Sequence, residues 1–130
     1  MSHLLLIDDD PDFSAAMAAR LRCAGHAVTC AASCQQGLAA LSVANDVEFD
    51  AVLVDMFMPK ADGIETIHAL RELGVSMPVI AISGGCSRAP DQVLEWAKSL
   101  GADASLAKPF AVDHLISLVA AMESQPHIGL

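Results

Sequence analysis

Short apolar runs alternate along the chain with segments in which apolar residues recur every three or four positions. The apolar runs cover residues 3–7, 26–30, 51–54, 78–82 and 104–107. The third run, Ala51–Val54, contains no polar residue. An uninterrupted apolar strand is typical of a parallel sheet that is buried on both faces.

Helical periodicity fills the intervals between these runs. We expect helices over residues 11–24, 33–43, 62–73, 91–100 and 113–124. Asp10 before Pro11 is a favourable N-cap, as are Ser33 and Asp62 before the next two helices. The pattern therefore alternates strand and helix five times, which predicts an α/β fold with a doubly wound parallel sheet in a single domain. We assign residues 1–125 to this domain and 126–130 to a short tail.

The first helix has an apolar stripe of Phe13, Met17 and Leu21 at four-residue spacing, which predicts its buried side. On its outer side we expect the small residues Ala15, Ala18 and Ala19, with Ser14 and Arg22 nearby. In the third helix, Ile67 and either Leu70 or Leu73 should face inward.

Composition excludes several classes of function. The 130 residues suit one domain, and the net charge of -9 opposes binding to a nucleic acid backbone. No apolar run approaches the length of about 18 residues that a membrane span needs. The first residues lack the basic region of a secretory signal, so we expect a cytoplasmic protein that contacts neither nucleic acid nor membrane.

The cysteines, Cys23, Cys30, Cys34 and Cys86, form no C-x-x-C pair. The spacing of His26, Cys30 and Cys34 matches no common zinc site. We expect buried or half-buried free thiols, because cysteine is often a small core residue.

Polar groups follow four of the five predicted strands. Asp8 and Asp9 follow the first, Asp55 ends the third, Ser83 follows the fourth and Lys108 follows the fifth. The carboxyl ends of parallel strands lie at one edge of a sheet, so these groups should converge. If the strand order is 2-1-3-4-5, the acids of the first and third strands face one crevice.

These residue types suit phosphoryl transfer. Two carboxylates about 4 Å apart repel by roughly 4 kcal/mol at an effective dielectric constant of about 20, and a divalent cation such as Mg²⁺ removes that cost. An aspartate can accept a phosphoryl group, while Lys108 and the Ser83 hydroxyl can contact phosphoryl oxygens. Each residue also has a simpler explanation: Asp9 or Asp10 as a helix cap, Ser83 as a turn residue, and Lys108 as a solvated lysine.

The chain resembles the receiver domain of two-component response regulators. The resemblance covers about residues 3–123 and rests on the motifs Leu5–Pro11, Val54–Pro59 with Asp62-Gly63, Ile82–Gly84 and Lys108–Phe110.

This resemblance implies a flavodoxin-like (βα)5 fold with strand order 2-1-3-4-5 and Asp55 as the phosphoacceptor. It implies Mg²⁺ bound by Asp9, Asp55 and the Phe57 carbonyl, with Asp8 in contact directly or through water. Ser83 and Lys108 would contact the phosphoryl group. The donor would be a histidine kinase or a histidine phosphotransfer protein, and the output would pass through contacts with an unidentified protein. A receiver is not an enzyme beyond its own phosphorylation and dephosphorylation.

The sequence departs from the family pattern at two positions. Ser105 stands where receivers often have a switching aromatic residue, and Phe57 stands where small polar residues often help water attack. Both departures bear on output and on phosphoryl lifetime.

Three alternatives remain open. A small phosphatase resembling the haloacid dehalogenase superfamily would use Asp8 as nucleophile and Asp10 as general acid, but the paired acids expected after the lysine are missing, and Asp113 is the only aspartate there. A pseudo-receiver would only bind partners. Met1 just before the first strand favours a stand-alone receiver, and the alternative is a receiver cut from a larger regulator or hybrid kinase.

Overall fold

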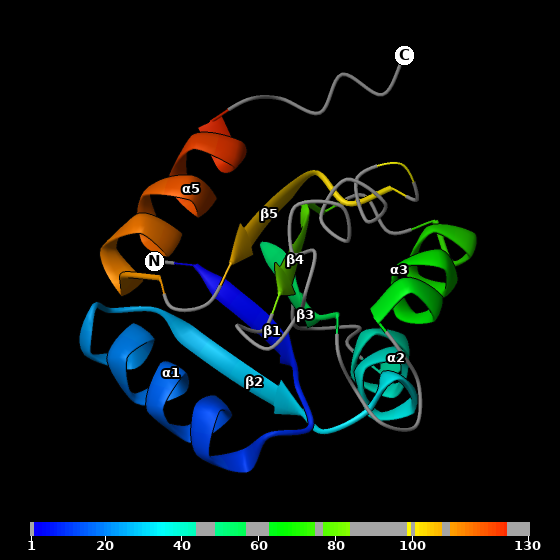
Figure 1. The fold of residues 1–130 in the computed structure, drawn as a ribbon, viewed down its shortest axis with the longest axis horizontal. Coiled ribbons are helices and arrows are strands. Elements are labelled where there is room, and N and C mark those ends of the chain that lie inside the picture. The colour runs from blue at the N-terminus through cyan, green and yellow to red at the C-terminus, as the bar shows by residue number, and fades with distance from the viewer. Residues whose placement is uncertain are drawn as a thin grey trace.

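A single sheet of five parallel strands forms the centre of the molecule, in the order β2-β1-β3-β4-β5 (Figure 1). The computed structural model describes residues 2–43, 49–56, 63–74, 77–83, 99, 101–107 and 110–124. The strands are β1 (His3–Ile7), β2 (Ala27–Ala31), β3 (Ala51–Asp55), β4 (Val79–Ser83) and β5 (Ala104–Ala107). The predicted α/β class and strand order are confirmed.

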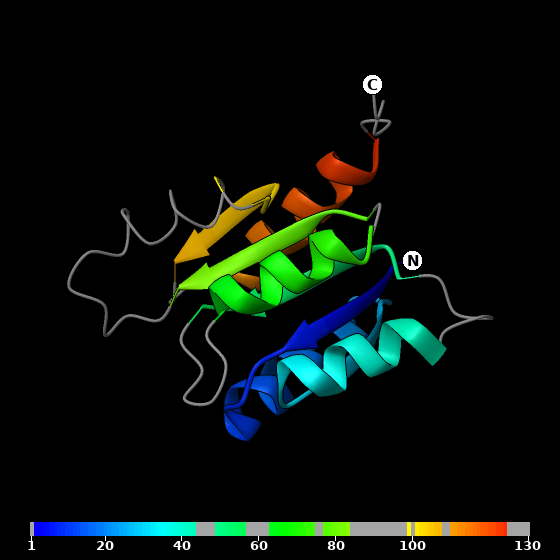
Figure 2. The ribbon, with the colours of Figure 1, turned by 90° about the vertical axis from the view of Figure 1, so that its right-hand side faces the viewer.

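Helices cover both faces of this sheet (Figures 1 and 2). The described helices are α1 (Pro11–Cys23), α2 (Cys34–Val43), α3 (Gly63–Glu72) and α5 (Val112–Ser124). Helices α1 and α5 lie on one face, and α2 and α3 lie on the other. The predicted helix over 91–100 falls outside the described residues except for Ser99, which is helical, and the predicted tail at 126–130 also falls outside.

The burial pattern explains why the central strands are so apolar. Every residue of β3 is buried, and Leu5, Ile7, Val52 and Val54 pack under α2 and α3. Leu4, Leu6 and Leu53 pack under α1 and α5. A strand with helices on both sides has no wet face, so the alternation of polar and apolar residues disappears.

Both ends of α1 are fixed by hydrogen bonds. The Asp10 carboxylate accepts the backbone N–H groups of Asp12 and Phe13, as predicted for an N-cap. At the other end the N–H of Gly25 donates to the Arg22 carbonyl, and the N–H of His26 donates to the Leu21 carbonyl. This is a Schellman motif, with Gly25 at a φ of 94°. Because His26 belongs to this cap, β2 begins at Ala27 rather than at His26 as predicted.

The buried stripe of α1 differs from the prediction. It consists of Ser14, Met17, Ala18 and Leu21, whereas Phe13 is only half-buried. The placement of Ser14 and Ala18 on the outer side was therefore wrong. Both are small residues on the same face as Met17 and Leu21, and they let the helix approach the sheet closely. In α3, Leu70 is buried and Leu73 is exposed.

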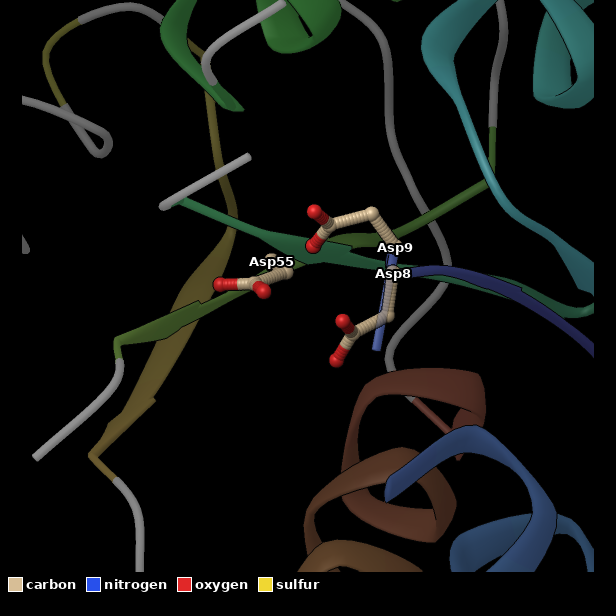
Figure 3. Close-up of side chains that lie close together, drawn as sticks. All are labelled: Asp8, Asp9 and Asp55. Atoms are coloured by element: carbon tan, nitrogen blue, oxygen red, sulfur yellow. The ribbon is translucent and has the colours of Figure 1, made fainter. Parts of the chain in front are cut away.

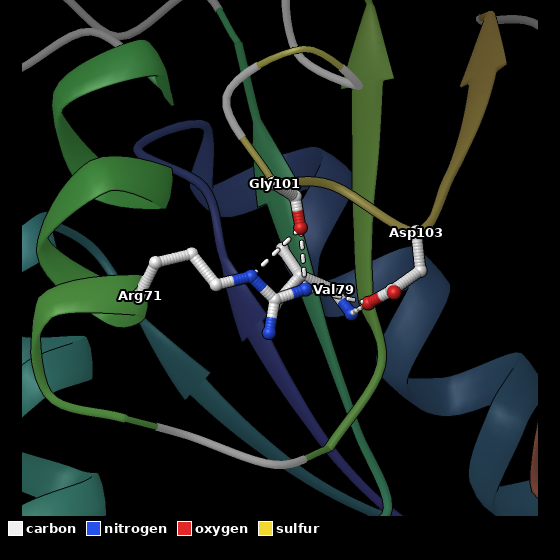
Figure 4. A network of polar contacts seen from close by, with 4 residues as sticks. All are labelled: Arg71, Val79, Gly101 and Asp103. Carbon is white, nitrogen blue, oxygen red and sulfur yellow. Dashed lines mark hydrogen bonds and ion pairs between the residues drawn. The ribbon is translucent and has the colours of Figure 1, made fainter. Parts of the chain in front are cut away.

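A polar network ties the end of α3 to the start of β4 and β5 (Figure 4). The guanidinium group of Arg71 donates through both Nε and Nη2 to the Gly101 carbonyl and pairs through Nη2 with the Asp103 carboxylate at 2.7 Å. The same carboxylate accepts the N–H of Val79 at 2.8 Å. Gly101 has a φ of 124°, and a Cβ there would lie 2.7 Å from Arg71 Cγ, so glycine is required.

The described cysteines are more exposed than expected. Cys34 is half-buried, but Cys23 and Cys30 are exposed, which corrects the expectation for those two residues. Cys23 ends α1 beside its cap, and Cys30 lies on the edge strand β2. Partial desolvation still raises the pKa of the Cys30 thiol, and the Arg22 guanidinium opposes that shift. Cys86 lies outside the described residues.

Within the described part of the chain, no helix combines the length and the apolar character needed to span a bilayer.

Candidate functional site

The strand register brings three of the predicted acids together at the carboxyl edge of the sheet. In the parallel pairing of β1 with β3, Ile7 lies opposite Val54, so Asp8 and Asp55 follow at adjacent positions. Asp8, Asp9 and Asp55 each offer an oxygen that lies within 4.8 Å of the others. Figure 3 shows their carboxyl groups gathered beyond the ends of β1 and β3.

The acids differ in burial. Asp8 is 2% exposed and Asp55 is 5% exposed, whereas Asp9 is half-buried. Removing a carboxylate from water is costly unless hydrogen bonds or a cation compensate for the lost hydration. The N–H of Asp10 donates to Asp8 Oδ1 at 2.9 Å, which orients this carboxylate.

Asp10 has a separate task from Asp8 and Asp9. Its Oδ1 accepts the N–H of Asp12 at 3.0 Å and that of Phe13 at 3.2 Å. Of the two acids considered as caps, the structure therefore assigns the cap to Asp10. The phosphatase alternative requires Asp10 as its general acid, but the carboxylate of Asp10 is already occupied as the N-cap of α1.

The donor set fits a magnesium ion. All the donors are hard carboxylate oxygens, which Mg²⁺ prefers. Opposite ligands of an octahedral Mg²⁺ with bonds of about 2.1 Å lie about 4.2 Å apart. Adjacent ligands lie only about 3.0 Å apart, so oxygens within 4.8 Å of one another reach a shared ion by rotation of the carboxylate side chains.

For the other predicted site residues, the structure describes the backbone of Ser83 and of the strands that lead to the site. Asp55 pairs with Ile82, and Ser83 pairs with Ala107, the residue before Lys108 in the sequence. The ends of β3, β4 and β5 therefore lie side by side. The side chain of Ser83 and all of Lys108 and Phe57 lie outside the described residues.

One contact near the site was not anticipated from the sequence. The rings of Phe13 and Phe110 meet edge to face, with centroids 6.4 Å apart and an interplanar angle of 76°. Phe110 belongs to the motif Lys108–Phe110, but the sequence alone offered no partner for it. Only the packing of α1 against α5 creates the pair.

Residues 4–120 match the family of response regulator receiver domains. The chain belongs to this family. The match, together with the strand order and the cap formed by Asp10, favours a receiver over a phosphatase of the haloacid dehalogenase type.

Relatives of this receiver domain bear similar names. It is 36% identical to the response regulator receiver protein Anae109_2439 of Anaeromyxobacter sp. (strain Fw109-5), over 91% of this chain and 47% of that protein. It is 33% identical to the response regulator MprA of Mycobacterium sp. (strain KMS), over 92% of this chain and 50% of that protein. The chain thus spans about half the length of the curated relatives it matches.

Solved receiver structures resemble it closely. The receiver domain of the Francisella response regulator 1452 superimposes with a TM-score of 0.81 at 27% identity, covering 95% of this chain and 98% of that one. Vibrio cholerae chemotaxis protein CheY4 gives a TM-score of 0.78 at 26% identity, covering 94% of this chain and 98% of that one.

Proposed function

We propose that Asp55 of this receiver accepts a phosphoryl group from a histidine kinase or a histidine phosphotransfer protein. The observation that carries the proposal is the gathering of Asp8, Asp9 and Asp55 at the edge where β1 and β3 end. A single acid at a strand end is a common turn feature, but two buried carboxylates beside a third need a compensating positive charge.

In the proposed transfer, an oxygen of Asp55 forms a new bond to phosphorus. The bond from phosphorus to the donor breaks, and the donor's imidazole, or acetate when the donor is acetyl phosphate, leaves with the bonding pair. Phosphoryl transfer depends mainly on positioning and on neutralising charge. Lys108 supplies a positive charge and Ser83 a hydroxyl donor for the phosphoryl oxygens.

Asp8, Asp9, Asp55 and the Phe57 carbonyl would hold Mg²⁺, with Asp8 bound directly or through water. When bound, the ion offsets the repulsion between the carboxylates and the incoming phosphate. We place the protein in the cytoplasm, where it signals through contacts with an output protein and performs no catalysis beyond its own phosphorylation and dephosphorylation.

Acyl phosphate trapping tests the proposal. Incubation with acetyl phosphate and Mg²⁺ should add one phosphoryl group, seen by intact mass, and Asp55→Asn should abolish the adduct. Asp12→Asn is the matched control, because Asp12 is an exposed acid on α1 outside the cluster, and it should label normally. Full labelling of Asp55→Asn, or an adduct mapped to Asp8, would overturn the assignment.

For the donor protein we propose docking on the exposed side of α1, which starts beside the acid pair. With Ala18 buried, that side presents Ala15 and Ala19, both exposed. Ala15→Arg should slow transfer from the cognate kinase several-fold and leave labelling by acetyl phosphate unchanged. Equal slowing with both donors would mean that the substitution had damaged the site instead.

A further inference from the structure

The contact between Phe13 and Phe110 joins two segments that carry different parts of the proposed site. Phe13 lies in the first turn of α1, which follows the acid pair. Phe110 follows Lys108 by two positions and precedes α5. Both rings are half-buried and pack against the apolar cluster under α1 and α5. Their edge-to-face arrangement is one that aromatic pairs favour.

A chain of short contacts connects Phe13 to the acids. Asp8 Oδ1 accepts the N–H of Asp10 at 2.9 Å, and Asp10 Oδ1 accepts the N–H of Phe13 at 3.2 Å. The first turn of α1 is therefore held to the end of β1 by hydrogen bonds as well as by the covalent chain. A shift of Asp8 relative to α1 would break one of them.

The segment that carries Lys108 is anchored at both of its described ends. Ala107 pairs with Ser83 at the end of β5. On the other side, the Ala111 carbonyl accepts the N–H groups of His114 and Leu115, and Leu115 is fully buried. Phe110 lies between these anchors, and its ring contacts the helix that follows the acids.

We propose that Phe13 and Phe110 are positioning residues for phosphoryl transfer. Their contact sets the distance between the acid cluster and the segment that brings Lys108 to the phosphoryl group. The inference rests on the proposed function of Asp55 and adds two residues that touch neither phosphate nor metal. Residues of this kind can affect the rate of phosphoryl transfer because the reaction depends on correctly placed charge.

The test compares rate constants for labelling by acetyl phosphate in saturating Mg²⁺. Phe13→Leu and Phe110→Leu retain apolar volume but lose the ring edge, and each should slow labelling by about three- to tenfold. Because one contact is lost in either case, the double variant should be no slower than the single variants. Phe13→Tyr keeps the ring and should label at the wild-type rate.

Two comparisons separate positioning from general packing. Phe49→Leu removes another aromatic contact, that with His3 at a centroid distance of 4.4 Å, near the amino ends of the strands. It should lower the melting temperature and leave the labelling rate unchanged. In a Lys108→Ala background, Phe110→Leu should cause no further loss, because the group that it positions is absent.

The inference is overturned if both leucine variants label at the wild-type rate while folded, or if their effects multiply in the double variant. Equal slowing by Phe110→Leu with and without Lys108 would also overturn it. A wild-type protein that is not labelled at Asp55 would instead refute the proposed function, so the two failures can be told apart.

Discussion

Three consecutive aspartates have different surroundings because a strand ends and a helix begins within them. Asp8 is buried beside Asp55, Asp9 is half-buried in the same cluster, and Asp10 caps α1. The sequence predicted the convergence of Asp8, Asp9 and Asp55, since strand order alone places their backbones at one edge. It also predicted Asp10 as the cap from its place before Pro11, and the hydrogen bonds from Asp12 and Phe13 confirm this.

At the same scale, Ser14 presents a buried hydroxyl with no hydrogen-bond partner among the described residues. Ser14→Ala should therefore raise the free energy of unfolding by up to about 1 kcal/mol, since a buried unsatisfied hydroxyl is costly and alanine favours the helix. Urea denaturation measures the change.

The matched control is Ala18→Ser, which places a hydroxyl at a site that is 2% exposed on the same stripe. It should lower stability by about 1 kcal/mol. A clear loss of stability in Ser14→Ala would contradict the interpretation and indicate that the hydroxyl has a partner.

At the scale of helices and strands, hydropathy predicted the elements that the structure describes but not all of their buried faces. The stripe of α1 was misassigned because two of its buried members, Ser14 and Ala18, are small and carry little apolar signal. Phe13 carries a strong signal but is only half-buried, and it contacts Phe110 from the segment before α5. A pattern within one helix cannot show a partner that tertiary packing brings from another.

The approach of α2 to β1 is close enough to require glycine at position 37. A Cβ at Gly37 would lie 2.5 Å from Cδ1 of Ile7, which is fully buried. Gly37→Ala should gain up to about 1 kcal/mol in helix propensity, yet destabilise the protein overall by about 1–3 kcal/mol through overpacking.

Thermal melts would show the loss, and adding Ile7→Val, which lacks Cδ1, should recover part of it. A Gly37→Ala variant more stable than wild type would mean that α2 can move away from the sheet without cost.

At the scale of the whole molecule, the edge of the sheet at the carboxyl ends of the strands and the edge at their amino ends have different roles. The carboxyl edge gathers acids that repel one another, whereas the opposite edge is tied by matched polar contacts. There the Asp50 carboxylate accepts the N–H of His3 at 2.7 Å, and Arg71 joins Gly101 and Asp103. The sequence indicated the first edge through its motifs, but the second depends on tertiary pairings that carry no local pattern.

Because three carboxylates lie close together and repel one another, bound Mg²⁺ should stabilise the whole fold. Binding to the native state alone adds about 1.4 kcal/mol at a free concentration about ten times Kd, which raises the melting temperature by a few degrees. Melts in EDTA and in Mg²⁺ measure the difference.

Asp9→Ala should largely remove this response, whereas Asp12→Asn should keep it. Identical melting temperatures for the wild-type protein across millimolar Mg²⁺ would count against the metal site.

The position of β1 between β2 and β3 also has a consequence for synthesis on the ribosome. Residues 4–7 pair with residues 51–54 on one side, while His3–Ile7 pair with Ala27–Ala31 on the other. A nascent chain thus exposes the apolar segment Leu4–Ile7 until translation has passed β3. Non-local parallel pairing forms slowly, and an unpaired apolar strand is prone to aggregate. Slow elongation between β1 and β3 should therefore make this chain depend more on chaperones than slow elongation after β5.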